Sequence, residues 1–157
     1  MTTHRRQYPI VLLLTLLAIG CQPSTSSSTV QTLPTVQMQM GSRTFTLEVA
    51  NNEPARETGL MRRDTMPADH GMIFVFDRPS NVGFYMKNTR IPLDIVFVDS
   101  DGGVISIKQM KPYDLSTTWA DGQAKWAIEL NLGAAAGAGV KVGDKLQIPE
   151  SARNASP

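Results

Sequence analysis

The chain has 157 residues, of which 41% are hydrophobic and 18% are charged, and its formal net charge is +1. A chain of this length can form one ordinary domain with a modest core, and a charge so close to zero argues against a basic face that binds nucleic acid. If the first 20 residues were removed, two of the 15 Lys and Arg residues and none of the 14 Asp and Glu residues would be lost, and the charge would become −1.

Residues 1–20 have the pattern of a bacterial lipoprotein signal peptide. Arg5 and Arg6 precede an apolar run at residues 10–17, which is shorter than the stretch of about 20 apolar residues that a membrane-spanning helix needs. The run leads through Ala18 and Gly20 to Cys21, as a lipobox does, although Ala18 stands where Leu is commoner. The alternative is an ordinary secretory signal followed by an incidental cysteine.

Cys21 is the predicted lipidation site. It is the only cysteine of the chain, so it has no disulfide partner within the chain. Acylation would anchor the chain permanently, because each buried CH₂ group contributes about 0.8 kcal/mol. Gln22 follows it, where Asp would favour retention in the inner membrane. We therefore expect the chain in the cell envelope, at the periplasmic face of the outer membrane or at the surface if the host is Gram-negative.

Composition divides the remaining sequence into three parts. Residues 22–29 contain no charged or aromatic residue, which predicts a flexible, Ser/Thr-rich tether over residues 21–33. Residues 34–150 are expected to form a single β-rich domain. Residues 151–157 are expected to be a disordered tail.

Apolar and polar residues alternate over much of this domain, which predicts β-strands. Residues 36–40 and 45–49 alternate on either side of a turn at residues 41–43, as in a hairpin. Further strands are expected at residues 72–76, 83–86, 94–98, 104–107, 126–130 and 145–148. Two helical stretches are expected, one at residues 54–63, where Pro54 suits a first helical position, and one at residues 132–138. These elements predict a mainly β sandwich or barrel with one or two short helices.

Several blocks of the domain carry a resemblance to a known family. The central block is Ile-Pro-Leu-Asp-Ile-Val-Phe-Val-Asp at residues 91–99, and the others are residues 59–61, 71–76, 84–89, 128–133 and 143–144. In order and spacing they resemble the bacterial and archaeal family called domain of unknown function 192, with Tyr85 where that family usually has Trp. The resemblance implies a compact, mainly β, jelly-roll-like domain that is often exported and has no established activity.

A polar run between two apolar strands is the strongest candidate for a binding site. Lys87, Asn88, Thr89 and Asp94 place a cation, an amide, a hydroxyl and a carboxylate within eight residues, and such a cluster can hold a small anionic or carbohydrate ligand. The alternative is that Asn88 and Thr89 support a turn, while Lys87 and Asp94 pair or are solvated.

Arg56 and Glu129 are expected beside this run. Glu129 lies between Ile128 and Leu130 in a predicted strand, and a carboxylate there needs a partner if its face is buried. An ion pair of Glu129 with Arg56 or with Lys87 is the structural alternative to a binding role.

Catalytic and metal sites have less support in the sequence. His70 is the only histidine left after cleavage, and no serine lies in a Gly-x-Ser-x-Gly motif. Seven methionines of the domain could bind Cu(I), but they form no tight cluster and suit core packing better. The sequence at Asp99 resembles the start of a calcium loop, but Met110 takes the twelfth position. We therefore expect no metal and no cofactor.

The sequence favours a lipid-anchored accessory module of the cell envelope. It would bind a small ligand or an envelope protein without catalysing a reaction, and it would contact the membrane through its lipid. The alternative is a hydrolase that acts on envelope carbohydrate through paired carboxylates, Asp94 and Glu129.

Overall fold

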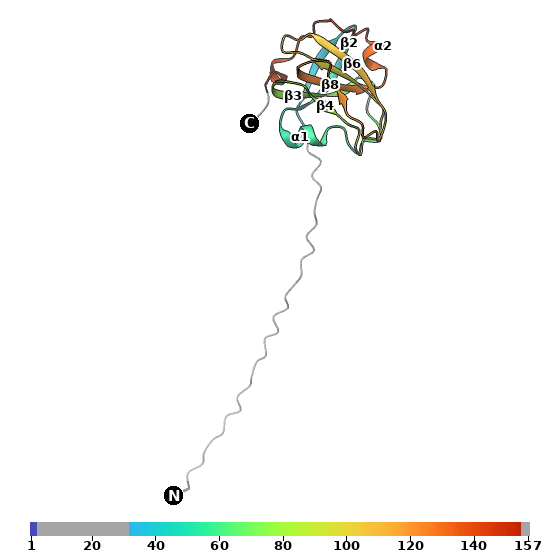
Figure 1. Cartoon of the computed structure of the whole chain (residues 1–157). Helices are drawn as coiled ribbons and strands as arrows, with labels where there is room; N and C mark the ends of the chain where they lie inside the picture. Colours follow the sequence, from blue (N-terminus) through green and yellow to red (C-terminus); the bar gives the residue numbers. More distant parts are fainter. Residues whose placement is uncertain (3–31, 155–157) are drawn as a thin grey trace. The chain divides into compact units, whose positions relative to one another are not determined.

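The computed structural model describes residues 1–2 and 32–154. Most of the expected signal peptide, Cys21 and nearly all of the expected tether fall outside the described residues. Residues 32–154 lie in one compact unit, which Figure 1 shows as a β-rich domain with α1 and α2 at opposite sides. Within the described residues, no helix combines the length and the apolar character needed to cross a bilayer.

The expected mainly β fold is confirmed. Its six-stranded sheet has the order β1-β2-β3-β8-β5-β6, and a small sheet pairs β4 with β7. The large sheet is open, with β1 and β6 at its edges, so the fold is not a closed barrel. The elements are β1 (Thr35–Met40), β2 (Arg43–Ala50), α1 (Glu53–Thr58), β3 (His70–Ser80), β4 (Gly83–Phe84), β5 (Leu93–Val98), β6 (Val104–Met110), β7 (Thr118–Trp119), β8 (Ala124–Asn131), α2 (Ala134–Gly137) and the 3-10 helix η1 (Glu150–Ala152).

The edge hairpin follows directly from the alternating sequence. In β1 every second residue is buried, and the apolar residues of β2 continue the same face. The strands pair in antiparallel register, with Met38 opposite Phe45. Because side chains alternate across a strand, this register places all the apolar residues of the hairpin on one side of the sheet.

The central strands are buried on both faces. All six residues of β5 are buried, as are six of the eight in β8. One apolar cluster covers the first face and includes Val96, Ile128 and alanines of α2, and a second covers the other face and includes Phe74, Phe97 and Ala55 of α1. Met72, Phe74, Phe97 and Ile128 are all buried. The sheet is thus a middle layer between two cores.

A helical crossover joins β2 to β3, which pair in parallel. Asn52 caps α1 by accepting a hydrogen bond from the Ala55 N–H at 3.0 Å, and Pro54 occupies the first turn, where its missing N–H costs nothing. Gly59 ends the helix with a φ of 48°, a left-handed conformation that suits glycine. The helix therefore stops at Thr58, earlier than the expected end at residue 63.

Two expectations near the C-terminus are corrected. Residues 145–148 form no strand, although Lys145 makes a single β-bridge to Gly103. The expected disordered tail from residue 151 is wrong for its first part, because η1 covers Trp126. The Trp126 indole N–H donates to the Ala152 carbonyl at 2.8 Å, and Ala152 is fully buried.

The second core gives a stability test. Phe97 is fully buried and packs its ring edge-on against Phe84, with centroids 5.8 Å apart. We expect Phe97→Ala to lower the free energy of unfolding by about 3 to 5 kcal/mol, a large part of the stability of a small domain. Urea unfolding checks this, with exposed Leu115→Ala as the control that should change little. Equal stability of the two variants would contradict the assignment of Phe97 to the core.

Candidate functional site

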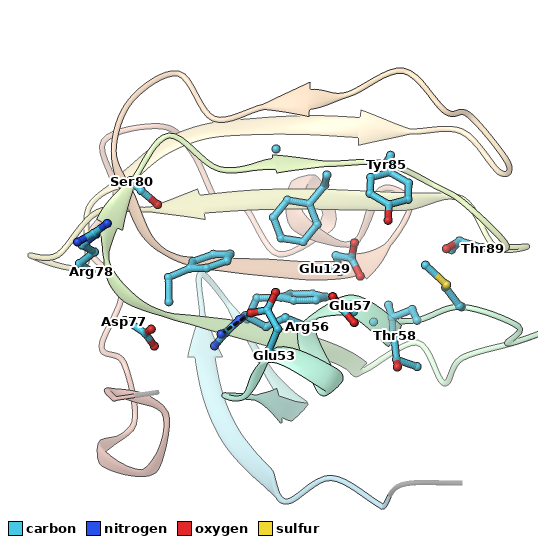
Figure 2. Close-up of a pocket in the computed structure, with 17 residues that line it drawn as sticks. Glu53, Arg56, Glu57, Thr58, Asp77, Arg78, Ser80, Tyr85, Thr89 and Glu129 are labelled. Carbon is cyan, nitrogen blue, oxygen red and sulfur yellow. Dashed lines mark hydrogen bonds and ion pairs between the residues drawn. The ribbon is translucent and has the colours of Figure 1, made fainter. Parts of the chain in front are cut away.

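A pocket of about 690 Å³ opens between α1, β3 and the β4 strand, and β8 contributes one residue to it (Figure 2). Its apolar wall is aromatic, with Phe74, Phe76 and Phe84 among the lining residues. Glu129 on β8 is only 5% exposed and points into the pocket. The charged lining residues besides Glu129 are Glu53, Arg56, Glu57, Asp77 and Arg78.

Strand register explains why Glu129 lies on this face. Glu129 stands opposite Met72 of β3 on one side and opposite Ile95 of β5 on the other. Met72 in turn stands opposite Glu48 of β2. Directly opposed residues share a face, so two carboxylates, Glu48 and Glu129, lie in one row across the sheet with a methionine between them.

Of these two carboxylates, Arg63 forms an ion pair only with that of Glu48. It forms a two-pronged ion pair with Glu48, in which Nη2 and Oε2 are 2.8 Å apart. Fork-to-fork pairs of this kind are the strongest arginine contacts. The Glu48 carboxylate raises the pKa of Arg63, with a smaller contribution from Glu129. Neither Arg63 nor Glu48 was predicted for the site, because nothing in their 15-residue separation indicates that they meet.

Glu129 makes no side-chain hydrogen bond and no ion pair within residues 32–154. Its oxygens are not among the fully buried atoms without a partner, because they border the pocket. Burial raises its pKa from 4.5 to about 8, and the positive charge of Arg63 offsets only part of this effect. Desolvation disfavours the charged form of a carboxyl group. At neutral pH the Glu129 carboxyl is therefore mainly protonated in the empty pocket.

The aromatic wall is a set of edge-to-face contacts centred on Phe84. Its ring centroid lies 4.9 Å from that of Phe74 and 6.4 Å from that of Phe76. Tyr85, 49% exposed, points into the same space as Glu129 (Figure 2). Gly59 also lines the pocket, and a Cβ there would be in contact with the Phe74 ring at 3.4 Å. The pocket thus combines apolar rings with one buried acid.

Three of the six predicted binding residues line this pocket, namely Arg56, Thr89 and Glu129. The predicted ion pair of Arg56 with Glu129 is wrong. The Arg56 guanidinium instead contacts the Glu53 carboxylate at 2.8 Å and donates to the Val75 carbonyl at 2.9 Å. Arg56 is thereby fixed at the rim.

The polar run does not form a site as a whole. Lys87 and Asn88 are exposed and do not line the pocket, and Lys87 does not pair with Glu129. Asn88 has a φ of 56°, a left-handed conformation that Asn tolerates, and the Thr89 N–H closes the turn onto the Met86 carbonyl at 3.1 Å. The turn alternative describes Asn88 and Thr89 as the structure has them.

Asp94 lies on the opposite face of the sheet. It stands opposite Leu130, which belongs to the first core, whereas the neighbouring Glu129 faces the second. Its Oδ2 accepts a hydrogen bond from the Ala135 N–H of α2 at 3.0 Å, and its buried Oδ1 has no hydrogen-bond partner among the described residues. The predicted pairing of Asp94 with Glu129 for hydrolysis is therefore wrong.

The remaining candidates from the sequence are the methionines, His70 and Asp99, and their contacts within residues 32–154 do not form a site. Most of the domain methionines are buried in the two cores, and no group of three His, Cys, Asp or Glu residues within the described chain is placed to hold a metal ion. The His70 Nδ1 lies 2.9 Å from the neighbouring Asp69 carboxylate. Asp99 accepts bonds from the N–H groups of Asp101 and Gly103, as in a tight turn between β5 and β6.

The resemblance found in the sequence is confirmed by a match to the family model DUF192, described as "Uncharacterized ACR", over residues 35–148. A comparison with curated proteins found no match. Among solved structures, a protein of unknown function from Novosphingobium aromaticivorans is 35% identical, with a TM-score of 0.69, and the match covers 76% of this chain and 89% of that one. A "putative transcription regulator" from Sinorhizobium meliloti is also 35% identical, with a TM-score of 0.66 and coverages of 71% and 89%.

Replacing Glu129 should change how stability depends on pH. The folded-state pKa of about 8 lies above the unfolded value of 4.5, so the wild-type domain should lose stability as pH rises between these values and level off above about 8. Glu129→Gln removes this loss and should be more stable than wild type by a few kcal/mol at pH 8, since each pKa unit is worth about 1.4 kcal/mol. At pH 4 the two should be similar.

Urea unfolding at pH 4, 6 and 8 measures this difference. Glu150→Gln is the matched control, because Glu150 is exposed and lies outside the pocket. Parallel pH profiles for wild type and Glu129→Gln would show that Glu129 does not titrate as its burial requires.

Proposed function

Because the chain belongs to the DUF192 family, whose description assigns no activity, we propose a function from its own residues: it is a lipid-anchored module of the cell envelope that binds a small ligand in the pocket above Glu129. Glu129 would be the recognition group, the phenylalanine rings would hold the apolar part of the ligand, and Cys21 would carry the lipid.

One observation supports the binding role above the others. A buried carboxyl group without a hydrogen-bond partner is costly, and buried polar groups are nearly always satisfied. Glu129 has this environment at a pocket wide enough for a small molecule, since ligand pockets occupy about 300 to 1,000 Å³. A ligand that bonds to Glu129 would supply the missing partner. The free energy lost by burying the carboxyl group without a partner would then be offset when the ligand binds.

The anchoring role is supported by the sequence at residues 1–21. The short apolar run, the small residues before Cys21 and the uncharged segment after it are all expected of a tethered lipoprotein. In this proposal the lipid anchors the chain in the membrane, and the pocket binds the ligand.

The anchor is tested by replacing the acylated residue. We expect Cys21→Ser to abolish labelling by radioactive palmitate and to move the chain from the membrane fraction to the soluble fraction. Asp64→Asn, an exposed substitution in the domain, should leave both unchanged. If the Cys21→Ser chain were still labelled and still sedimented with membranes, the lipoprotein proposal would be wrong.

The pocket is tested by blocking it. A thermal-shift screen of the full chain in detergent against amines, carboxylates, alcohols and saccharides should find at least one stabilising compound, because a ligand at about 100 times its dissociation constant adds about 2.7 kcal/mol. Thr58→Trp adds a ring to the pocket lining and should abolish that shift, whereas exposed Gln123→Trp should preserve it. A shift that survives Thr58→Trp would place binding elsewhere.

A further inference from the structure

One group that lines the pocket, the Glu129 carboxyl, has no hydrogen-bond partner within residues 32–154. The ionised Glu129 carboxylate needs a hydrogen-bond donor or a positive charge. Two arginines near it, Arg63 beside the row of carboxylates and Arg56 at the rim of the pocket, already have other partners. Arg63 is held by Glu48, and Arg56 is held by Glu53 and the Val75 carbonyl. Neither can turn to Glu129 without breaking a charge-assisted contact. Because no described residue makes a hydrogen bond or ion pair to Glu129, a group from outside the chain can be its partner.

We propose that the pocket takes a small organic amine, bound as its ammonium ion, with the nitrogen on the Glu129 carboxylate and the apolar body against the rings of Phe74, Phe76 and Phe84. The inference rests on the proposed binding function and names the ligand class for that site. An ammonium group satisfies both requirements at once, because it donates hydrogen bonds and carries the opposite charge.

The aromatic wall favours a cation over other polar ligands. The faces of phenylalanine and tyrosine rings attract ammonium ions, and the attraction grows when water is excluded. Three phenylalanines line the pocket, and Tyr85 points into the space above Glu129 (Figure 2). The Arg56 guanidinium already lies over the Phe76 ring, 6.0 Å from its centroid, which shows that this wall accepts a cation. Aromatic rings beside a single buried acid thus suit a molecule with an apolar body and one positive end.

The charged side chains at the rim of the pocket also favour a cationic ligand. Once Arg56 is paired with Glu53, the remaining charged residues are Glu57, Asp77 and Arg78, which leaves one carboxylate in excess. An anionic ligand would add a negative charge to a pocket whose rim already carries one carboxylate in excess, and like charges are unfavourable. A small anion, expected from the sequence, is therefore disfavoured in this pocket.

Binding of an ammonium ion should be coupled to the loss of a proton. Glu129 is mainly protonated at pH 7 in the empty pocket and has to ionise to pair with a cation. Besides Arg63, the groups that face it across the pocket are Glu53, Arg56 and Glu57 on α1, Asp77 and Arg78 on β3, and Tyr85. Affinity should then rise about 50-fold from pH 6 to pH 8, because only the ionised fraction is competent to bind.

The experiment is a calorimetric titration of the full chain in detergent with four small probes. Butylamine, butan-1-ol and butanoate share a chain length and differ in the polar end, and glucose represents saccharides. We expect butylamine to bind and butanoate not to bind. The heat of butylamine binding at pH 7 should depend on the ionisation enthalpy of the buffer, since a proton is released. Glu129→Gln should weaken butylamine binding at least tenfold, and Glu150→Gln should not change it.

The outcomes separate this inference from the proposed function. If butan-1-ol, butanoate or glucose binds in place of the amine and Thr58→Trp abolishes it, the pocket binds ligands but the amine assignment is overturned. If butylamine binds wild type and Thr58→Trp with the same affinity, it binds outside the pocket and the inference also fails. This second measurement leaves Glu129 unchanged, so it holds even if Glu129→Gln does not fold. If none of the four probes binds, the amine assignment fails, and a blank thermal-shift screen would remove the proposed function as well.

Discussion

The structure depends on one constraint, the burial of β5 and β8 on both faces of the sheet. A strand in that position has no solvent-facing side on which to place polar residues, so every polar side chain in it must be satisfied within the protein or by a ligand. Three buried polar side chains lie in the large sheet, Asp94, Ser106 and Glu129. The Asp94 Oδ2 accepts from the Ala135 N–H while its Oδ1 has no partner among the described residues, and the Ser106 hydroxyl accepts from the Asp121 N–H. Glu129 differs from both, because neither of its oxygens has a hydrogen-bond partner within residues 32–154 and the carboxyl faces a pocket.

The crossover between β2 and β3 leaves the buried Glu129 carboxyl open to the pocket. A parallel pair needs a connection that passes over one face of the sheet, and here α1 and the segment after it make that connection. The short helix ends at Thr58 and leaves an opening toward β4, so the face is covered by Ala55 and Leu60 while Glu129 stays reachable. Arg63, on the same connection, neutralises Glu48. Topology therefore decides which of the two carboxylates in the row is paired and which faces the pocket.

Much of the fold was predictable because the hydrophobic period reports burial. The alternation in residues 36–49 defines one buried face, and the continuous apolar residues of 95–98 predict a strand. The alternation does not reveal that a helix and a loop cover the second face, since this depends on contacts between residues far apart in sequence. The strand expected at residues 145–148 failed for a similar reason. Leu146 and Ile148 are buried in the first core, but among these residues only Lys145 makes a β-bridge, to Gly103.

The candidate site was predictable only in part. Glu129 was identifiable because a charged residue between Ile128 and Leu130 is conspicuous in an apolar strand. Its relation to Asp94 was not, because the face of one strand relative to another is set by register, and a change of one residue reverses it. The polar run at residues 87–90 indicated function by composition alone. The left-handed backbone at Asn88 shows that its polar residues serve the turn.

The two tryptophans give the domain a pair of built-in optical reporters with different surroundings. Trp126 is buried, its indole is bonded to the Ala152 carbonyl, and it belongs to the first core. Trp119 is 51% exposed, stands opposite Gly83 in the small sheet, and thus lies beside the strand that supplies Phe84 to the pocket. The fluorescence of Trp119 is therefore quenchable from solvent and sensitive to events near the pocket, while that of Trp126 follows the integrity of the fold. A single emission spectrum contains both signals, and replacing either indole with phenylalanine separates them.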